Sequence, residues 1–384
     1  MKKWYFLTFI LLTFIHFKAF SFFGIEFSLS LIIFPFWVLY TFKNISFTNN
    51  QKLLYFILVT LPFVNLYFIK DYPSFFQTYI YYFISISVLY IFIYKGKLRF
   101  QRSKVIDFFK RFQKFLFVIS SIQFISIYFF NYNGFYNLFG DFQLSIGVID
   151  MDSIIGNMRL KALYGEPSYF ALVINSFFIS IKFLDHKIKK TNFLLTVIML
   201  FFAQSGFGFV LFLVVIFMHF LRLKRLKLKY YAIFAFIFFG FILKDEIFIA
   251  LRIYEIFSND FTLSSGLSSG FMRIVFPLIV ITFIFKDLLL FGVPLGGVPV
   301  YLDEYHNISN INDIHNGLFL LIINFGLIAV FSIVYLLKKY RNNDLKFQLL
   351  VFFLIASMNS GAIYYPLSLL FLLIIPYLTI IDEA

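Results

Sequence analysis

The chain is a succession of apolar segments, most of them long enough to cross a lipid bilayer, separated by shorter polar stretches. Segments 53–69 and 75–94, for example, contain no charged residue. A helix needs roughly 17–25 mostly apolar residues to cross a bilayer, whereas the strands of a membrane barrel alternate in polarity. The pattern therefore predicts an all-α, polytopic membrane protein with about 12 transmembrane helices. We place them at 4–22, 26–42, 53–69, 74–94, 113–130, 167–183, 191–204, 206–221, 230–243, 317–337, 347–360 and 363–381.

Two apolar segments need a separate interpretation. Segment 191–221 has strongly basic residues on both flanks. Because basic flanks stay on the inner side, we expect a tight hairpin of two helices, broken at Gln204-Ser205-Gly206. Segment 274–285 is short for a span, and the Pro- and Gly-containing stretch behind it offers no second crossing. We therefore expect a membrane-surface or re-entrant helix on the outer side, within 272–291.

The composition agrees with an integral membrane protein. Hydrophobic residues make up 61% of the chain and charged residues 14%, whereas soluble domains are about half apolar and a quarter charged. Cysteine is absent, which excludes disulfides and thiolate chemistry. Met1-Lys2-Lys3 and the apolar segment behind it resemble a signal peptide, but no small-residue cleavage motif follows. We therefore expect an uncleaved first span.

The formal net charge of +14 follows the predicted topology. Loops rich in Lys and Arg stay in the cytoplasm. With Lys2 and Lys3 inside, alternation puts most of the 33 basic residues on the inner side and most of the 19 acidic residues outside. The basic excess is thus an orientation signal, and we expect no nucleic-acid partner. The sequence predicts one membrane domain over 1–384, with both termini cytoplasmic and two long outward loops at 131–166 and 244–316.

The first outward loop ends in a group of polar side chains. The middles of the spans hold almost no ionisable residue, with His16 and His219 as the candidates, which argues against an ion-coupled transporter. Polar residues gather in the outward loops instead. The first loop closes with Arg159, Lys161, Tyr164 and Glu166 immediately before a span that opens with Pro167. A functional site competes here with a simpler interpretation, in which these residues cap the helix and anchor the loop to the membrane.

The second outward loop holds Arg252, Arg273, the Pro- and Gly-rich stretch 292–299, and the pair His315-Asn316 at the start of a span. Loops of this length in a compact protein are usually functional or disordered. Taken alone, His315 is also typical of an interfacial histidine.

The same loop holds acidic residues and a second histidine that raise the question of a metal site. They are Asp303, Glu304, His306 and Asp313. Their spacing fits no standard ligand pattern, so we expect no metal and no cofactor.

Four motifs carry a resemblance to a known family. They are Arg159-x6-Glu166-Pro167-Ser168 opening a span, Arg273 after Ser269-Gly-Phe-Met, the small-residue stretch Phe291–Gly297, and His315-Asn316 followed by Gly326. Their order, spacing and placement on one membrane face resemble the superfamily of Wzy-type O-antigen polymerases and O-antigen ligases. The break at Gln204-Ser205-Gly206 lies where that superfamily often has a serine-containing turn. Two positions depart from the ligase-like pattern, namely Ala329 and Phe207, so the resemblance favours a polymerase over a ligase.

The resemblance implies a GT-C-like, all-α fold whose long outward loop carries short interfacial helices. It implies a metal-independent glycosyltransferase on the outer face of the bacterial cytoplasmic (inner) membrane. The donor would be a growing glycan on undecaprenyl diphosphate, and the acceptor a sugar hydroxyl of the next lipid-linked repeat unit of an O-antigen or capsular polysaccharide. Membrane lipids, a chain-length regulator and a flippase are the other partners that it suggests.

Roles for individual residues follow from the same resemblance. Arginine stays charged, and its planar fork binds two phosphate oxygens. Arg159 and Arg273, together with Lys161 and Arg252, are the expected diphosphate ligands. Histidine changes its protonation near neutral pH, so His315 is the expected base for the acceptor hydroxyl. Glu166 shares this role or orients its partners, and Tyr164 and Asn316 are the expected sugar contacts.

Two other functions stay open at this point. One is an O-antigen ligase that transfers finished glycan to lipid A core. The other is a flippase or another transporter of lipid-linked oligosaccharides. A flippase typically has charged residues facing a central cavity and two similar halves, and the sequence has neither feature.

Overall fold

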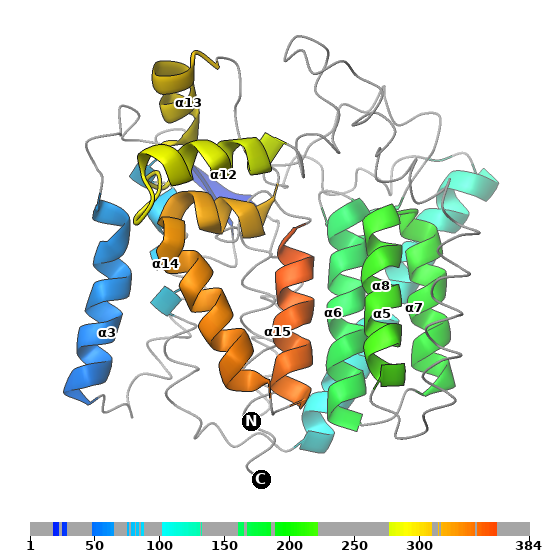
Figure 1. Cartoon of the computed structure of the whole chain (residues 1–384). Helices are drawn as coiled ribbons and strands as arrows, with labels where there is room; N and C mark the ends of the chain where they lie inside the picture. Colours follow the sequence, from blue (N-terminus) through cyan, green and yellow to red (C-terminus); the bar gives the residue numbers. More distant parts are fainter. Residues whose placement is uncertain are drawn as a thin grey trace. The chain divides into compact units, whose positions relative to one another are not determined.

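The structure is a computed structural model (Figure 1). It describes residues 18–22, 25–28, 48–64, 75–76, 78–80, 82–83, 86–87, 102–130, 132, 160–164, 167–185, 189–221, 276–308, 314, 316–341 and 344–358. Contacts divide the chain into two compact units. The first comprises 1–45, 92–216 and 369–384, and the second comprises 46–91 and 217–368. The predicted spans 230–243 and 363–381 lie outside the described residues.

The first unit is built on a helical bundle. Its helices are α5 (Arg102–Phe130), α6 (Pro167–Asp185), α7 (Lys190–Ala203) and α8 (Gly206–Leu221), the last of which runs on past the end of the unit. They lie side by side in Figure 1. Their core is aromatic, with the ring of Phe177 at 5.3 Å from that of Phe109 and 4.9 Å from that of Phe112. Gly208 lets α8 approach α6 closely, since an added Cβ would lie 2.5 Å from the Cβ of Ala171.

The predicted hairpin at 191–221 is confirmed. α7 ends where Gln204 takes a left-handed conformation, with φ 44°. The hydroxyl of Ser205 then accepts a hydrogen bond from the N–H of Gly208 at 3.2 Å, which caps the start of α8. α6 and α7 also match their predicted spans, and Pro167 opens α6 as expected. By contrast, α5 begins at Arg102 rather than near 113, because the Lys- and Arg-containing stretch before the apolar segment is also helical.

A short β-hairpin differs from the predicted spans 4–22 and 26–42. Strands β1 (Lys18–Phe22) and β2 (Ile25–Ser28) pair antiparallel, with Phe22 opposite Ile25 and Ser21 opposite Glu26. Apolar and polar residues alternate with a period of two in β2 and from Phe20 to Phe22 in β1, which is typical of strands. The rest of the described secondary structure is helical.

The second unit contains α3 (Asn49–Thr60), α12 (Phe276–Asp287), α13 (Val298–His306), α14 (Gly317–Tyr340) and α15 (Asp344–Ser357). α14 packs against both α12 and α15. α3 starts with a capping box between Thr48 and Gln51 and gives way to a 3-10 turn, Leu61–Phe63, that contains Pro62. A short helix lies within 272–291 as expected, namely α12, whereas its expected place at the outer membrane surface stays a prediction.

The predicted spans 53–69 and 74–94 lie against each other. The hydroxyl of Tyr82 donates to the carbonyl of Leu58 at 2.8 Å, and that of Tyr79 donates to Val59 at 3.1 Å. These bonds give buried or half-buried hydroxyls a partner, which an apolar environment requires.

Apolar side chains are exposed along the helices, as a membrane protein requires. Two helices in the described part are long and apolar enough to cross a bilayer, namely Val105–Phe130 and Gly317–Tyr340. On α5, Val118, Ile122, Ile125 and Phe129 follow one another at helical spacing and are 46–74% exposed. In water such a stripe would be buried, whereas lipid tails solvate it. The described residues do not test the number of spans.

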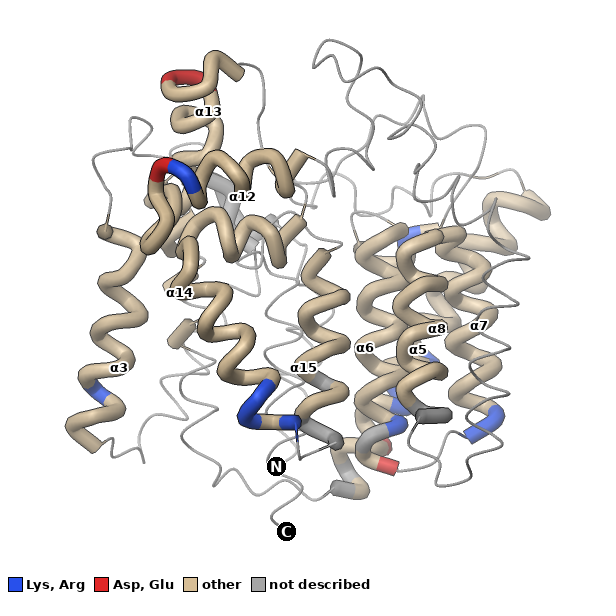
Figure 2. Tube along the Cα trace, viewed as in Figure 1, with Lys and Arg blue, Asp and Glu red and all other residues tan. Residues whose placement is uncertain are grey.

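Among the described residues of each unit, most of the basic ones gather at one end (Figure 2). In the first unit, Lys110 pairs with Asp185 at 2.8 Å and Lys189 approaches the same carboxylate at 3.8 Å, where α5 and α7 begin and α6 ends. In the second unit, the basic residues of α14 follow its last turns, whereas acidic residues lie on α12 and α13. Each unit therefore has a basic end, as the predicted orientation requires.

Candidate functional site

The predicted site residues divide between the two units. Lys161 and Tyr164 belong to the first unit and Asn316 to the second, and all three are described. The other predicted site residues lie outside the described residues. They are Arg159, Glu166, Arg252, Arg273 and His315. The chain beside several of them is nevertheless defined, and the convergence of the two loops stays a prediction.

In the first unit, residues 160–164 form a segment docked on the bundle, which we call the clamped segment. Leu160 is completely buried and belongs to an apolar cluster with Ile127, Phe124 and Phe202. Its N–H donates to the carbonyl of Phe202 at 3.0 Å, at the end of α7 away from the basic residues. The last part of the first outward loop is therefore fixed to the helices rather than lying on the membrane surface.

Gln123 of α5 holds the middle of the clamped segment. Its side-chain Nε2 donates to the carbonyl of Ala162, and its Oε1 accepts from the N–H of the same residue, each at 2.9 Å. Ala162 has a φ of 50°, which is the left-handed conformation that residues other than glycine rarely adopt. The N–H of Tyr164 then donates to the carbonyl of Lys161 at 2.9 Å and closes the turn.

Lys161 and Tyr164 are both removed from solvent. Lys161 is 9% exposed, and this burial lowers the pKa of its ammonium group. Tyr164 is completely buried, its ring stacks on that of Phe170, and burial raises the pKa of its hydroxyl. A cation buried in this way disfavours the interpretation of Lys161 as a solvated membrane anchor. The hydroxyl of Tyr164 stays protonated and can donate a hydrogen bond.

In the second unit, Asn316 caps α14. Its side-chain Oδ1 accepts a hydrogen bond from the N–H of Phe319 at 3.1 Å, and the residue is 1% exposed. The cap fixes the start of the helix directly after His315. Since Oδ1 takes part in the cap, the predicted sugar contact of Asn316 would have to use its Nδ2 group.

α14 is interrupted at Gly326, and the turn after α12 fills the interruption. We call this arrangement the helix break. Gly326 has φ 53° and ψ −138°, which only glycine adopts readily. The N–H of Leu327 donates to the carbonyl of Leu289 at 3.0 Å instead of to its own helix, and the carbonyl of Ile323 accepts from the N–H of Val293 at 2.9 Å.

Two glycines make this crossing possible. An added Cβ on Gly292, with φ 65°, would lie 2.1 Å from the carbonyl oxygen of Ile323. One on Gly326 would lie 2.6 Å from that of Leu289. Both glycines belong to motifs singled out in the sequence, but nothing in the sequence indicated that they meet.

The break changes the interpretation of the predicted span 317–337. Residues 317–325 form a half-helix that lies along α12, and residues 327–340 continue in a different direction (Figure 1). Interrupted helices inside membrane proteins occur where the backbone is buried in protein or lines a site. Here the interruption sets the direction of the half-helix that begins directly after His315.

Sequence reasoning missed a polar cluster on α12 and α13. The hydroxyl of Tyr301 donates to Oδ2 of Asp287 at 2.7 Å, and Nε2 of His306 lies 3.2 Å from that oxygen and 3.0 Å from the hydroxyl. The ring of His306 stacks on Phe283 at 4.0 Å. Burial and the hydrogen bond to Asp287 raise the pKa of Tyr301. Because Asp287 lies outside the group weighed as metal ligands, the spacing of that group gave no signal of this cluster.

The cluster accounts for His306 without a metal ion. His306 had been weighed as a ligand together with Asp303, Glu304 and Asp313, and its Nε2 contacts Asp287 and Tyr301 instead. Within the described ranges, no group of three or more residues has the arrangement of a metal site.

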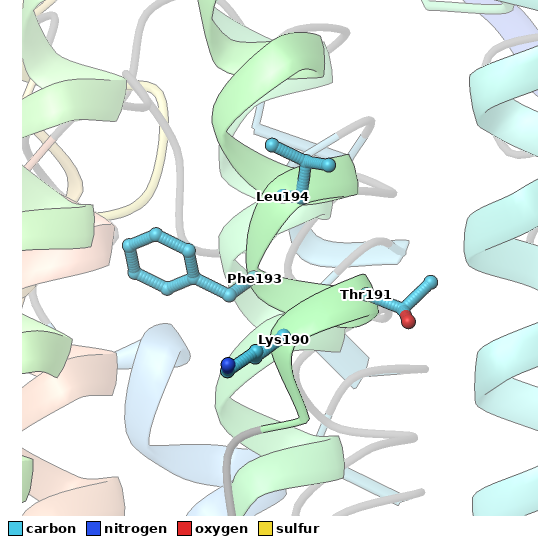
Figure 3. A pocket seen from close by; sticks show the side chains of 4 residues that line it. All are labelled: Lys190, Thr191, Phe193 and Leu194. Atoms are coloured by element: carbon cyan, nitrogen blue, oxygen red, sulfur yellow. The ribbon is translucent and has the colours of Figure 1, made fainter.

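A hollow of about 470 Å³ lies at the start of α7, lined by Lys190, Thr191, Phe193 and Leu194 (Figure 3). It is at the basic end of the first unit. The clamped segment contacts the other end of α7, through Phe202. The hollow is therefore separate from Lys161 and Tyr164, the predicted site residues of this unit that are described.

The model of the WcaD colanic acid polymerase family matches residues 4–382, which include both outward loops and both units. No curated protein matches the chain, and no solved structure does.

Proposed function

Because the chain belongs to the WcaD colanic acid polymerase family, we propose that it extends a polysaccharide by transferring a growing glycan from undecaprenyl diphosphate to the next lipid-linked repeat unit. Family membership confirms the predicted relation to Wzy-type polymerases and makes the chain a membrane-bound polysaccharide polymerase with glycosyltransferase-type activity. The match over residues 4–382 is the observation that carries the proposal.

The proposed transfer needs a base for the acceptor hydroxyl and positive groups around the leaving diphosphate. The acceptor hydroxyl attacks the anomeric carbon of the donor sugar, and the bond from that carbon to the diphosphate oxygen breaks. The acceptor proton moves to His315, and the lipid diphosphate leaves with the electron pair of the broken bond. Negative charge grows on the diphosphate, so positive groups held around it stabilise the transition state.

We assign the other predicted residues to this scheme. Arg159, Arg273, Lys161 and Arg252 hold the diphosphate. The described member of this group, Lys161, supports the assignment because it is a buried cation at the end of the bundle away from the basic residues.

The remaining residues act on the sugars. Glu166 shares the proton with His315 or orients it, and Tyr164 and Asn316 contact the sugars.

The site would face the outer side of the bacterial inner membrane, with both termini in the cytoplasm. Support comes from the charges, because each unit carries basic residues at one end, and that end belongs inside. A flippase that delivers the repeat units and a chain-length regulator are the proposed partners.

The test uses the purified full-length chain in liposomes, supplied with undecaprenyl-diphosphate-linked repeat units from the host bacterium. We expect ladders of longer lipid-linked glycans with the natural sequence. Arg159→Ala, Arg273→Ala and His315→Ala should each reduce elongation by about 10²-fold or more. Lys190→Ala, at the hollow on α7, is the matched control and should elongate normally.

Cells carrying the same variants separate the rival functions. A polymerase defect leaves single repeat units on the final acceptor, and this result supports the proposal. Loss of all transfer to the acceptor indicates a ligase, and accumulation of repeat units on the cytoplasmic side indicates a flippase. Either of the last two results overturns the proposal.

A further inference from the structure

Gln123 connects a transmembrane helix to the proposed diphosphate site. It lies in the C-terminal half of α5 and is 4% exposed. Both polar atoms of its side-chain amide bind the backbone of one residue, Ala162, which is 39 positions away in sequence. The side-chain amide binds the N–H and the carbonyl of Ala162 as a neighbouring β-strand would, and the two bonds together fix the position and the orientation of this peptide backbone. Ordinary packing needs neither of these two bonds.

The residue so held is a strained one. A left-handed conformation is unfavourable for a residue with a Cβ, and strain of this kind persists only where the surroundings enforce it. Gln123 supplies that enforcement at Ala162, where φ is 50°. Lys161 lies directly before the strained residue, and Tyr164 follows two positions later. The conformation of Ala162 therefore sets the directions of these two buried side chains.

α5 offers an internal comparison for this residue. Gln113 is a second buried glutamine on the same helix, 1% exposed. Its Nε2 donates to the carbonyl of Asn192 at 3.2 Å and to the hydroxyl of Thr196 at 2.7 Å. Gln113 thus ties α5 to α7, whereas Gln123 ties α5 to the clamped segment. Loss of either amide removes buried hydrogen bonds, but only the loss of Gln123 frees the backbone of the clamped segment next to the proposed site.

We propose that Gln123 is a positioning residue for the glycosyl transfer, acting through Lys161 and Tyr164 without touching substrate itself. The inference rests on the proposed function. The clamp grips backbone atoms only, and Ala162 is 2% exposed. The side chain at 162 therefore matters through the conformations that it permits and through the space that it needs. Glycine there keeps the clamp, and a β-branched residue opposes it.

The experiment measures two quantities on the full-length chain. One is the affinity for undecaprenyl diphosphate alone, and the other is the elongation rate in liposomes at equal amounts of folded protein. For Gln123→Leu we expect about tenfold weaker binding and elongation about 10²-fold slower, since displacement of a positioned group by about 1 Å has effects of that size. Gln113→Leu should lose stability but keep both quantities within about twofold of the natural sequence.

Variants at position 162 separate positioning from stability. Ala162→Gly should bind and elongate normally, and Ala162→Val should reproduce the defect of Gln123→Leu with the glutamine still present. Equal affinity and elongation in Gln123→Leu and Gln113→Leu would overturn the positioning role. If the natural sequence does not elongate but the two glutamine variants still differ in diphosphate affinity, the proposed function fails and the positioning role stands.

Discussion

The clamped segment of the first unit and the helix break of the second unit both hold a non-helical stretch of backbone in place, but through different kinds of hydrogen bond. Each fixes a short non-helical stretch next to predicted site residues. In the clamped segment a side chain, that of Gln123, binds the backbone of Ala162. In the helix break two backbones bind each other directly, between the turn after α12 and the interrupted α14.

The difference lies in what each arrangement tolerates. A side chain spans the distance between α5 and the segment, so the strength of the clamp depends on one residue, Gln123. The helix break brings two backbones together with no side chain between them, which is why Gly292 and Gly326 stand at the crossing. We expect the break to be the more rigid of the two and the less tolerant of substitution.

The largest effect is expected at the crossing. Gly326→Ala would put a Cβ 2.6 Å from the carbonyl oxygen of Leu289, in a conformation that alanine resists. We expect destabilisation on the order of 3 kcal/mol or more, measured as thermal unfolding in detergent and as the yield of folded protein. Gly297→Ala is the matched control, because its nearest contact is the carbonyl oxygen of Pro294 at 3.2 Å. Equal stability of the two variants would contradict the crossing.

A smaller effect is expected from Lys161, and it depends on pH. Burial lowers the pKa of this lysine from its usual value near 10.5. The charged form attracts the diphosphate, so affinity is fully present below the lowered pKa and declines as pH rises through it. Titration of undecaprenyl diphosphate binding against pH should show this decline below pH 10.5. Lys161→Arg should abolish it, because arginine keeps its charge. A decline that persists in the arginine variant would assign the titration to another group.

The smallest effect is expected in the cluster on α13. Tyr301→Phe removes one hydrogen bond to Asp287 and leaves His306 in place to contact that carboxylate. Because the aspartate keeps a partner, the cost should be about 1 kcal/mol, seen as a small shift of the unfolding temperature. His306→Ala should cost more, since it also removes the stack on Phe283. The reverse order would mean that the cluster is not what holds α13.

Local features were predictable from the sequence because local rules produce them. The helices α6, α7 and α8 follow from apolar runs, and Gln204-Ser205-Gly206 marks the turn between α7 and α8 by residue type. α12 was expected as a short surface helix because its apolar run is too short to cross. The strands at 18–28 were missed, because a helical span was assigned by apolar length where residues alternate with a period of two.

Contacts between distant residues were not predictable in this way. Gln123 is one of several polar residues in an apolar helix, and nothing near it in sequence points to Ala162. The two glycines of the crossing each mark a flexible position, but their meeting depends on the packing of α12 on α14. For the site, the sequence identified the loops and the residue types, and family membership supported the chemistry. The contacts that hold the backbone beside those residues, at Gln123 and at the glycine crossing, are visible only in the structure.

The central claim is that the ends of the two outward loops form one pocket on the outer surface. Because the chain has no cysteine, single cysteines at positions 159 and 315 can be labelled without background. A thiol reagent that does not cross the membrane should modify both from the outside, and a cross-linker of about 10 Å should join them within one chain. Labelling of the two positions from opposite sides of the membrane would contradict the shared site and, with it, the proposed mechanism.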